Sequence, residues 1–234
     1  MKLLQYWDTG NPPDEVAAWI DGFRTMNPDM QHRLYDRDRA SRFIGKHLGE
    51  RNRRAFDALA VPSMQSDYFR ACALLIKPGA YVDADSVTSR PLRELFAHVP
   101  NAMILSWKDR YQLGLMMFRR PGDPLIAAWL AHITRNVEHR LDDNASVVTG
   151  PWAIRQVIEA AEPNSPVRAS VANITPLLWS DAGPWIGLPR PGYKEGPRHW
   201  ANWRGPQYLE SLAADGAAAL LSARASGIVG PEVE

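Results

Sequence analysis

The chain has 234 residues, 45% of them hydrophobic and 23% charged, and its formal net charge is +1. These values are typical of a globular protein, they give no argument for nucleic acid as a partner, and no apolar run approaches the roughly 18 residues of a membrane span. Cys72 is the only cysteine, which excludes an internal disulfide and a cysteine-based zinc site. Because the polar N-terminus does not resemble a signal peptide either, the sequence predicts a cytoplasmic protein.

Strands and helices are expected to alternate along most of the chain. Hydrophobic periodicity and turn residues predict, in chain order, strand 2–6, helix 13–26, strand 31–35, helices 38–48, 51–59 and 63–76, strand 79–83, helix 91–97, strands 102–107 and 113–118, helix 123–140, strand 147–149 and helix 151–161. We expect a strand over 167–174, an irregular segment rich in Trp, Pro and Gly over 176–206, and a helix over 207–226 to follow.

This alternation favours an α/β fold with a mostly parallel central sheet flanked by helices. No linker or internal repeat divides the sequence, so we expect a single domain over residues 1–234. Within it, residues 1–162 form the regular core, and residues 163–234 form the irregular closing segment and a C-terminal helix.

Two carboxylates lie at the end of the strand expected over 79–83. Asp83 and Asp85 are two residues apart, so they either share one face of the strand or separate where it becomes a loop. Two acids this close repel each other unless a cation lies beside them, and carboxylate oxygens suit Mg²⁺ or Mn²⁺. The same pair is also consistent with solvated aspartates in a turn.

Other polar and aromatic residues are expected near these acids. Asp67 and Arg70 are three apart on a helix and share one face, either as a surface ion pair or as a pair directed into a site. Trp7 and Thr149, like the two acids, follow expected strands. Ligands of parallel α/β sheets bind beyond the carboxyl ends of the strands, so we group these residues at one edge of the sheet.

The central part of the sequence resembles a known family signature. Its segments Ser66-Asp67-Tyr68-Phe69-Arg70, Leu74-Leu75 and Gly79-Ala80-Tyr81-Val82-Asp83-Ala84-Asp85 are similar to those of DXD-containing sugar transferases of glycosyltransferase family 32, and more distantly to the glucosylating domains of large clostridial toxins. The opening strand with Trp7, the triplet Thr149-Gly150-Pro151 and the late segment His199-Trp200-Ala201-Asn202-Trp203 resemble flanking segments of that family. Two positions depart from the pattern, because Gln5 stands where a histidine is usual and Pro78 where a glycine is usual.

The resemblance implies a GT-A-type fold and a nucleoside-diphosphate sugar donor, either a UDP- or a GDP-sugar. It also implies Mn²⁺ or Mg²⁺ and retaining transfer to a glycan, a lipid-linked sugar or a protein. The catalytic residues that it implies are Asp67, Arg70 and Asp83. The implied nucleotide-sugar-binding residues are Trp7, Asp67, Arg70, Tyr81, Asp83, Asp85, His199 and Trp203, and the implied metal ligands are Asp85, Asp83 and His199.

Two other interpretations stay open. Residues 81–87 also fit the first motif of haloacid dehalogenase-type phosphatases and phosphotransferases, with Asp83 as nucleophile, Asp85 as general acid/base and Asp142-Asp143 as the late acidic pair. That motif normally lies on the first strand, whereas about 80 residues precede it here. The other interpretation is a non-catalytic homologue that binds nucleotide or carbohydrate.

A cluster of arginines at positions 51, 53 and 54 suggests two further interpretations. It is expected either to form a solvated helix face or to support peripheral association with an anionic membrane.

Overall fold

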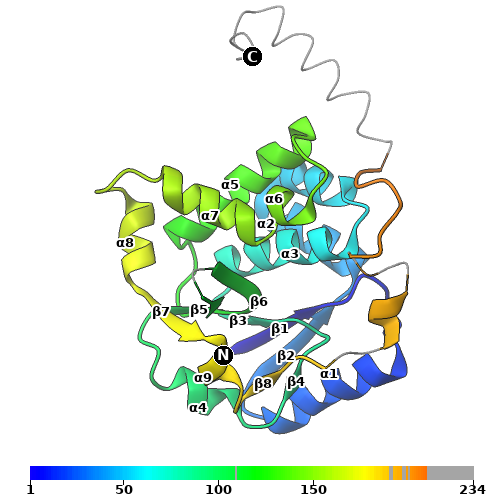
Figure 1. The fold of residues 1–234 in the computed structure, drawn as a ribbon, viewed down its shortest axis with the longest axis vertical. Helices are drawn as coiled ribbons and strands as arrows, with labels where there is room; N and C mark the ends of the chain where they lie inside the picture. Colours follow the sequence, from blue (N-terminus) through cyan, green and yellow to red (C-terminus); the bar gives the residue numbers. More distant parts are fainter. Residues whose placement is uncertain (109, 190–191, 197–198, 200, 210–234) are drawn as a thin grey trace, which may run out of the picture.

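The computed structural model describes residues 1–108, 110–189, 192–196, 199 and 201–209. Its centre is a six-stranded sheet in the order β2-β1-β3-β6-β5-β7, with helices on both faces (Figure 1). The strands of this sheet are β1 (Lys2–Tyr6), β2 (Gln31–Tyr35), β3 (Gly79–Val82), β5 (Ala102–Trp107), β6 (Arg110–Phe118) and β7 (Ile174–Leu178). A second, two-stranded sheet pairs β4 (Val87–Thr88) with β8 (Ile186–Gly187).

The helices are α1 (Asp14–Met26), α2 (Arg37–Ala58), α3 (Pro62–Ile76), α4 (Leu92–Phe96), α5 (Pro124–His139), α6 (Ala145–Val148), α7 (Pro151–Ala160), α8 (Pro166–Ala172) and α9 (Trp179–Ala182), with a 3₁₀ turn, η1, at Gly192–Glu195. Among the described residues, no helix has both the length and the apolar character of a membrane span.

The expected mostly parallel sheet is confirmed. β1 pairs in parallel with β2 and with β3, and β5 pairs in parallel with β7. β6 is antiparallel to both of its neighbours, β3 and β5. The hairpin expected over 102–118 is therefore present, and β6 brings its first residues to the carboxyl end of β3.

Two core layers lie on opposite faces of the sheet. The larger one packs α2, α3, α5 and α7 on one face, and its largest fully buried side chain is Trp129. The other face is covered by α1, α4 and α9 around residues such as Phe23 and Phe96. α3 lies inside the larger layer with residues buried all around it, which explains why its polar side chains are enclosed as well as its apolar ones.

Most of the regular core, up to residue 140, follows the sequence predictions. The two helices expected over 38–59 are consecutive parts of α2, separated by the left-handed backbone of Gly49 (φ 83°).

The expected strand over 147–149 is wrong, because these residues belong to α6 and its C-cap. The Asn144 side chain accepts a hydrogen bond from the Ser146 amide, and this N-cap outweighs the strand preference of two valines.

The prediction also fails after residue 163. Residues 166–172 form α8, which starts with the Ser165 cap and Pro166 at the first helical position, so the strand begins only at Ile174. The segment 176–206 is less irregular than expected, since it contains the end of β7 together with α9, β8 and η1. Residues 207–209 are not helical, because Tyr208 forms a bridge to Leu59. The rest of the expected final helix lies outside the described residues.

Gly79 tests the close approach of β1 and β3. A Cβ atom at this position would lie 2.6 Å from the Lys2 carbonyl oxygen, so Gly79→Ala must shift backbone. We expect a loss of about 1–3 kcal/mol in the free energy of unfolding, measured by urea denaturation. The matched control is Gly22→Ala at an exposed position of α1, where no atom lies within 4 Å of the added Cβ and helix propensity favours alanine. Equal stability of the two variants would contradict this account of the strand pair.

Candidate functional site

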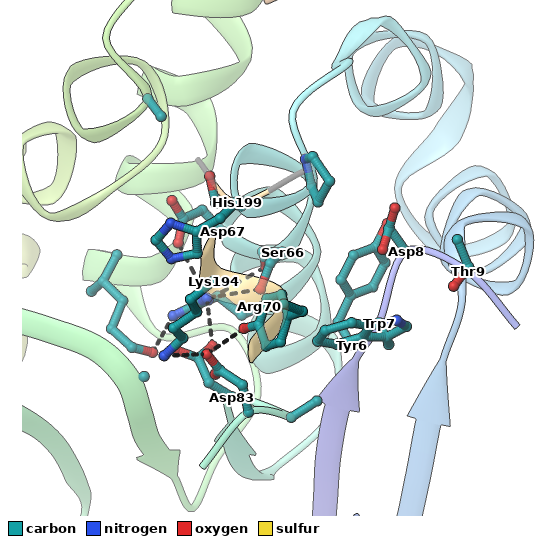
Figure 2. A pocket seen from close by; sticks show the side chains of 18 of the residues that line it. Tyr6, Trp7, Asp8, Thr9, Ser66, Asp67, Arg70, Asp83, Lys194 and His199 are labelled. Carbon is teal, nitrogen blue, oxygen red and sulfur yellow. Dashed lines mark hydrogen bonds and ion pairs between the residues drawn. The ribbon is translucent and has the colours of Figure 1, made fainter. Parts of the chain in front are cut away.

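A cavity of about 1050 Å³ opens at the carboxyl ends of β1 and β3. Figure 2 shows Arg70, Asp83 and Lys194 converging in it, with Trp7 at the end of β1 nearby. The walls come from the loop after β1, the first half of α3, the loop after β3, the start of β6, the region of α6 and α7, and η1 with His199. The sequence-predicted residues that line it are Trp7, Asp67, Arg70, Asp83, Asp85 and His199.

Arg70 is the central cation of this cavity. It is only 4% exposed, and its guanidinium donates to the Asp83 carboxylate at 2.9 Å and lies 3.3 Å from the Asp67 carboxylate. Burial alone would lower the pKa of Arg70, but the neighbouring carboxylates raise this pKa above its ordinary value. Arg70 therefore stays charged and joins two carboxylates from α3 and the end of β3.

Further contacts fix the guanidinium of Arg70. It donates to the Ser66 hydroxyl at 2.8 Å and to the Leu113 carbonyl of β6, and it lies over the ring of Tyr81 at 4.4 Å from the centroid. The Tyr81 hydroxyl is hydrogen-bonded to Ser66 at 2.7 Å. Tyr81 is fully buried and does not line the cavity, so its role is to hold the Arg70 guanidinium in position.

Asp67 is held between a cation and a hydroxyl. The Thr149 hydroxyl donates to its carboxylate at 3.2 Å, so Thr149 does reach the site although α6, not a strand, carries it there. A Cβ atom at Gly150 would lie 3.2 Å from the same carboxylate oxygen, which shows how closely the backbone approaches. Burial raises the pKa of Asp67 to about 6, although Arg70 acts in the opposite direction.

Asp85 is held by the late segment of the chain. The Tyr193 hydroxyl donates to its carboxylate at 2.6 Å, and the Lys194 ammonium lies 2.7 Å from the same oxygen. The Tyr193 ring packs edge-on against Trp7, with centroids 5.1 Å apart. It also lies 6.3 Å from the His199 ring. η1 thus covers the cavity next to both Asp85 and Trp7.

Sequence reasoning missed Tyr193 and Lys194. They lie more than a hundred residues after Asp85, in a segment whose composition suggested only irregular structure. The adjacent aromatic and basic side chains were the only available signal.

Trp203 does not join the site. Its indole donates to the Pro206 carbonyl at 3.2 Å and packs beside Gly205, and it is not among the residues that line the cavity.

The donor atoms of this cavity fit a divalent ion only in part. The described residues contain no group of three His, Cys, Asp or Glu side chains placed to hold a metal. Asp83 and Asp85 supply hard oxygen atoms, and each already has a basic neighbour. Mg²⁺ commonly binds to one or two carboxylates together with substrate phosphates. The set therefore suits an ion that also has phosphate oxygens as ligands, not a closed protein cage.

Comparison with solved structures identifies the fold. The chain is similar to the PaToxG glycosyltransferase with a TM-score of 0.56 and 12% identity, over 87% of this chain and 85% of that one. Two structures of LgtC, one of an active-site mutant and one of the galactosyltransferase with donor and acceptor sugar analogues, match at 11% and 10% identity over 99% of this chain and 98% of theirs. Their TM-score of 0.34 is too low to support an argument.

The chain thus has the GT-A-type glycosyltransferase fold that the resemblance implied. Neither protein-family models nor curated protein sequences give a match.

The pKa of Asp67 gives a testable pH dependence. Its folded value of about 6 exceeds the ordinary 3.8, so folding favours the protonated acid, and this contribution is lost as pH rises through 6. The difference corresponds to roughly 3 kcal/mol at most. Relative to Asp67→Asn, which cannot ionise, the wild-type protein should therefore lose stability between pH 4 and 7, as measured by urea denaturation. A constant difference between the two proteins across this range would contradict the assignment.

Proposed function

We propose that the protein is a glycosyltransferase that uses a nucleoside-diphosphate sugar, with UDP or GDP as the nucleotide. Buried Arg70, fixed between Asp67 and Asp83 on one wall of the cavity, is the observation that carries this proposal. A guanidinium with two carboxylates offers both donors and acceptors to a sugar. The acceptor classes are a glycan, a lipid-linked sugar or a protein, and retention of anomeric configuration belongs to the same proposal.

The cavity offers distinct surfaces to the parts of such a donor. Trp7 and Tyr193 form an aromatic corner suited to a nucleobase. Asp67, Arg70 and Asp83 offer hydrogen bonds to sugar hydroxyls. Its volume is at the upper end of the range for ligand pockets, which suits a donor with three parts.

Breaking the glycosidic bond leaves negative charge on the diphosphate. Arg70 and Lys194 are fixed cations of this cavity that stabilise such charge. Asp85, with Asp83 and His199 nearby, would hold Mn²⁺ or Mg²⁺, which acts as a Lewis acid on phosphoryl oxygens. η1 contacts Asp85 and would keep water, which hydrolyses the donor, away from this end of the cavity.

The phosphatase-type alternative has less support from the geometry. Asp83 accepts from Arg70, and the late acids Asp142 and Asp143 are exposed and do not line the cavity.

Donor turnover decides between the glycosyltransferase and the phosphatase proposals. A thermal-shift screen of UDP- and GDP-sugars with Mn²⁺, followed by donor hydrolysis with and without EDTA, should identify one donor whose turnover EDTA abolishes. A covalent aspartyl-phosphate analogue trapped by beryllofluoride would instead favour the phosphatase.

Asp85 tests the proposed metal ligand. In the wild-type protein, Mn²⁺ should tighten binding of UDP or GDP, because Asp85 would hold an ion that also attracts the phosphates. In Asp85→Asn we expect this tightening to fall at least about tenfold, measured by calorimetry with the nucleotide alone. Asp142→Asn, an exposed acid outside the cavity, is the matched control. Equal metal dependence in both variants would remove Asp85 from the metal site.

Trp7 tests the proposed base contact. Stacking of a base on an aromatic side chain contributes about 1–3 kcal/mol, so Trp7→Ala should weaken nucleotide binding roughly 5- to 150-fold. Trp107→Ala is the control, since that side chain is 54% exposed and does not line the cavity. Equilibrium dialysis with labelled UDP or GDP measures both. Unchanged affinity in Trp7→Ala would place the base elsewhere.

A further inference from the structure

Five basic side chains gather on the α2–α3 side of the sheet, near its edge strand β2. They form what we call the basic patch: Lys2, Arg33, Arg42, Lys46 and Lys77. In the register of β1 and β2, Leu4 lies opposite Arg33. Lys2, Leu4 and Arg33 therefore point to the same face, which is the face packed under α2 and α3.

The helices bring the other three cations to the same place. Arg42 and Lys46 are four apart on α2 and share its exposed side. Lys77 directly follows α3, and its ammonium lies 4.6 Å from the centre of the Phe43 ring of α2. Burial lowers the pKa of Lys77, and the charges of Lys2, Arg33 and Lys46 lower it further, as expected for neighbouring cations.

Over the residues that the structure describes, the positive charges of the basic patch are not balanced by carboxylates in contact with them. Within the described part of the chain, none of its five cations forms an ion pair with a carboxylate. The arginine cluster at positions 51, 53 and 54, which the sequence also offered for an anionic membrane, does form ion pairs. Arg51 pairs with Glu138 at 2.7 Å, and Arg53 pairs with Asp57 at 2.8 Å. Two of the three arginines of that cluster are therefore paired, whereas among the described residues none of the five cations of the basic patch is.

Protection of an exposed sheet edge explains only part of this arrangement. A charged side chain on an edge strand prevents pairing with other strands, which accounts for Arg33. It does not account for Arg42, Lys46 and Lys77, which come from helices. Cations collected from two strands, a helix and a helix end form a broad surface that suits a spread-out anionic partner.

We propose that the basic patch docks the protein on a membrane surface that carries anionic lipid headgroups. Nucleic acid fits less well, because the aromatic ring of the patch, Phe43, is 8% exposed beneath Lys77 and cannot stack on a base. Each cation near an anionic surface strengthens the attraction by about fivefold, and this attraction is screened by salt.

Docking at the patch leaves the cavity open. α3 carries Asp67 near its start, and Lys77 follows its end, ten residues later. Ten residues of helix span about 15 Å, so the patch and the cavity lie at opposite ends of α3. A membrane bound at the patch would therefore not cover the cavity, and variants of the patch leave the cavity lining unchanged.

Cosedimentation of the full chain with vesicles tests the patch. We expect binding to phosphatidylcholine vesicles that contain phosphatidylserine, and none to phosphatidylcholine alone. Arg33→Glu with Lys46→Glu should lower the partition coefficient more than about tenfold. Lys46→Gln with Lys77→Gln, a milder pair, should also lower it. Arg93→Glu with Arg135→Glu, both exposed and outside the patch, makes the same net charge change as the first pair and should bind as the wild type does.

Nucleotide binding by the same variants separates the membrane proposal from the proposed glycosyltransferase activity. All folded variants should keep wild-type nucleotide binding, since the patch does not line the cavity. The proposal is overturned if the wild type does not prefer phosphatidylserine vesicles, if the Arg93 and Arg135 pair weakens binding as much as the patch pairs, or if the patch variants lose binding to an oligonucleotide but not to vesicles.

Discussion

The buried ion-pair group of Arg70 is the constraint on which the site depends. A guanidinium keeps its charge when only 4% exposed, so its burial requires carboxylates and hydrogen-bond acceptors around it, and Asp67 and Asp83 supply the compensating charge. Removing one partner of such a group typically costs about 3–5 kcal/mol, because the remaining charge stays buried. The group therefore ties the start of α3 to the end of β3 and fixes the geometry of the cavity wall.

The antiparallel strand β6 completes this wall through its backbone. The Asp83 amide donates to the Gly114 carbonyl at 2.9 Å, and Arg70 donates to the carbonyl of Leu113. A Cβ atom at Gly114 would lie 2.8 Å from the Asp83 carboxylate, so any residue other than glycine would displace the Asp83 side chain. A sheet that was parallel throughout would not start a strand at this edge. β6 runs in the opposite direction to its neighbours, so its first residues supply backbone carbonyls at the edge where the parallel strands end.

The sequence predicted the parts of the site that local pattern determines. β1, β3 and α3 have clear periodicity, and the ends of these elements place Trp7, Asp67 and Asp83 at one edge of the sheet. α6 and α8 were missed because single capping side chains, at Asn144 and Ser165, decided between helix and strand. Tyr193 and Lys194 were missed for another reason. Their contact with Asp85 joins distant segments, and no local pattern encodes such a contact.

The contact between η1 and Asp85 has a consequence for ligand entry. Tyr193 and Lys194 bind the same oxygen of the Asp85 carboxylate, and the Tyr193 ring packs edge-on against Trp7. In the proposed enzyme, an ion would share the Asp85 carboxylate with both contacts, and the base would lie beside the Tyr193 ring. Their geometry lets one short turn respond to the two ends of a nucleotide at once, because the aromatic contact and the carboxylate contact belong to the same residue. A single side chain, Tyr193, thus links the aromatic corner proposed for the base to the carboxylate proposed for the metal.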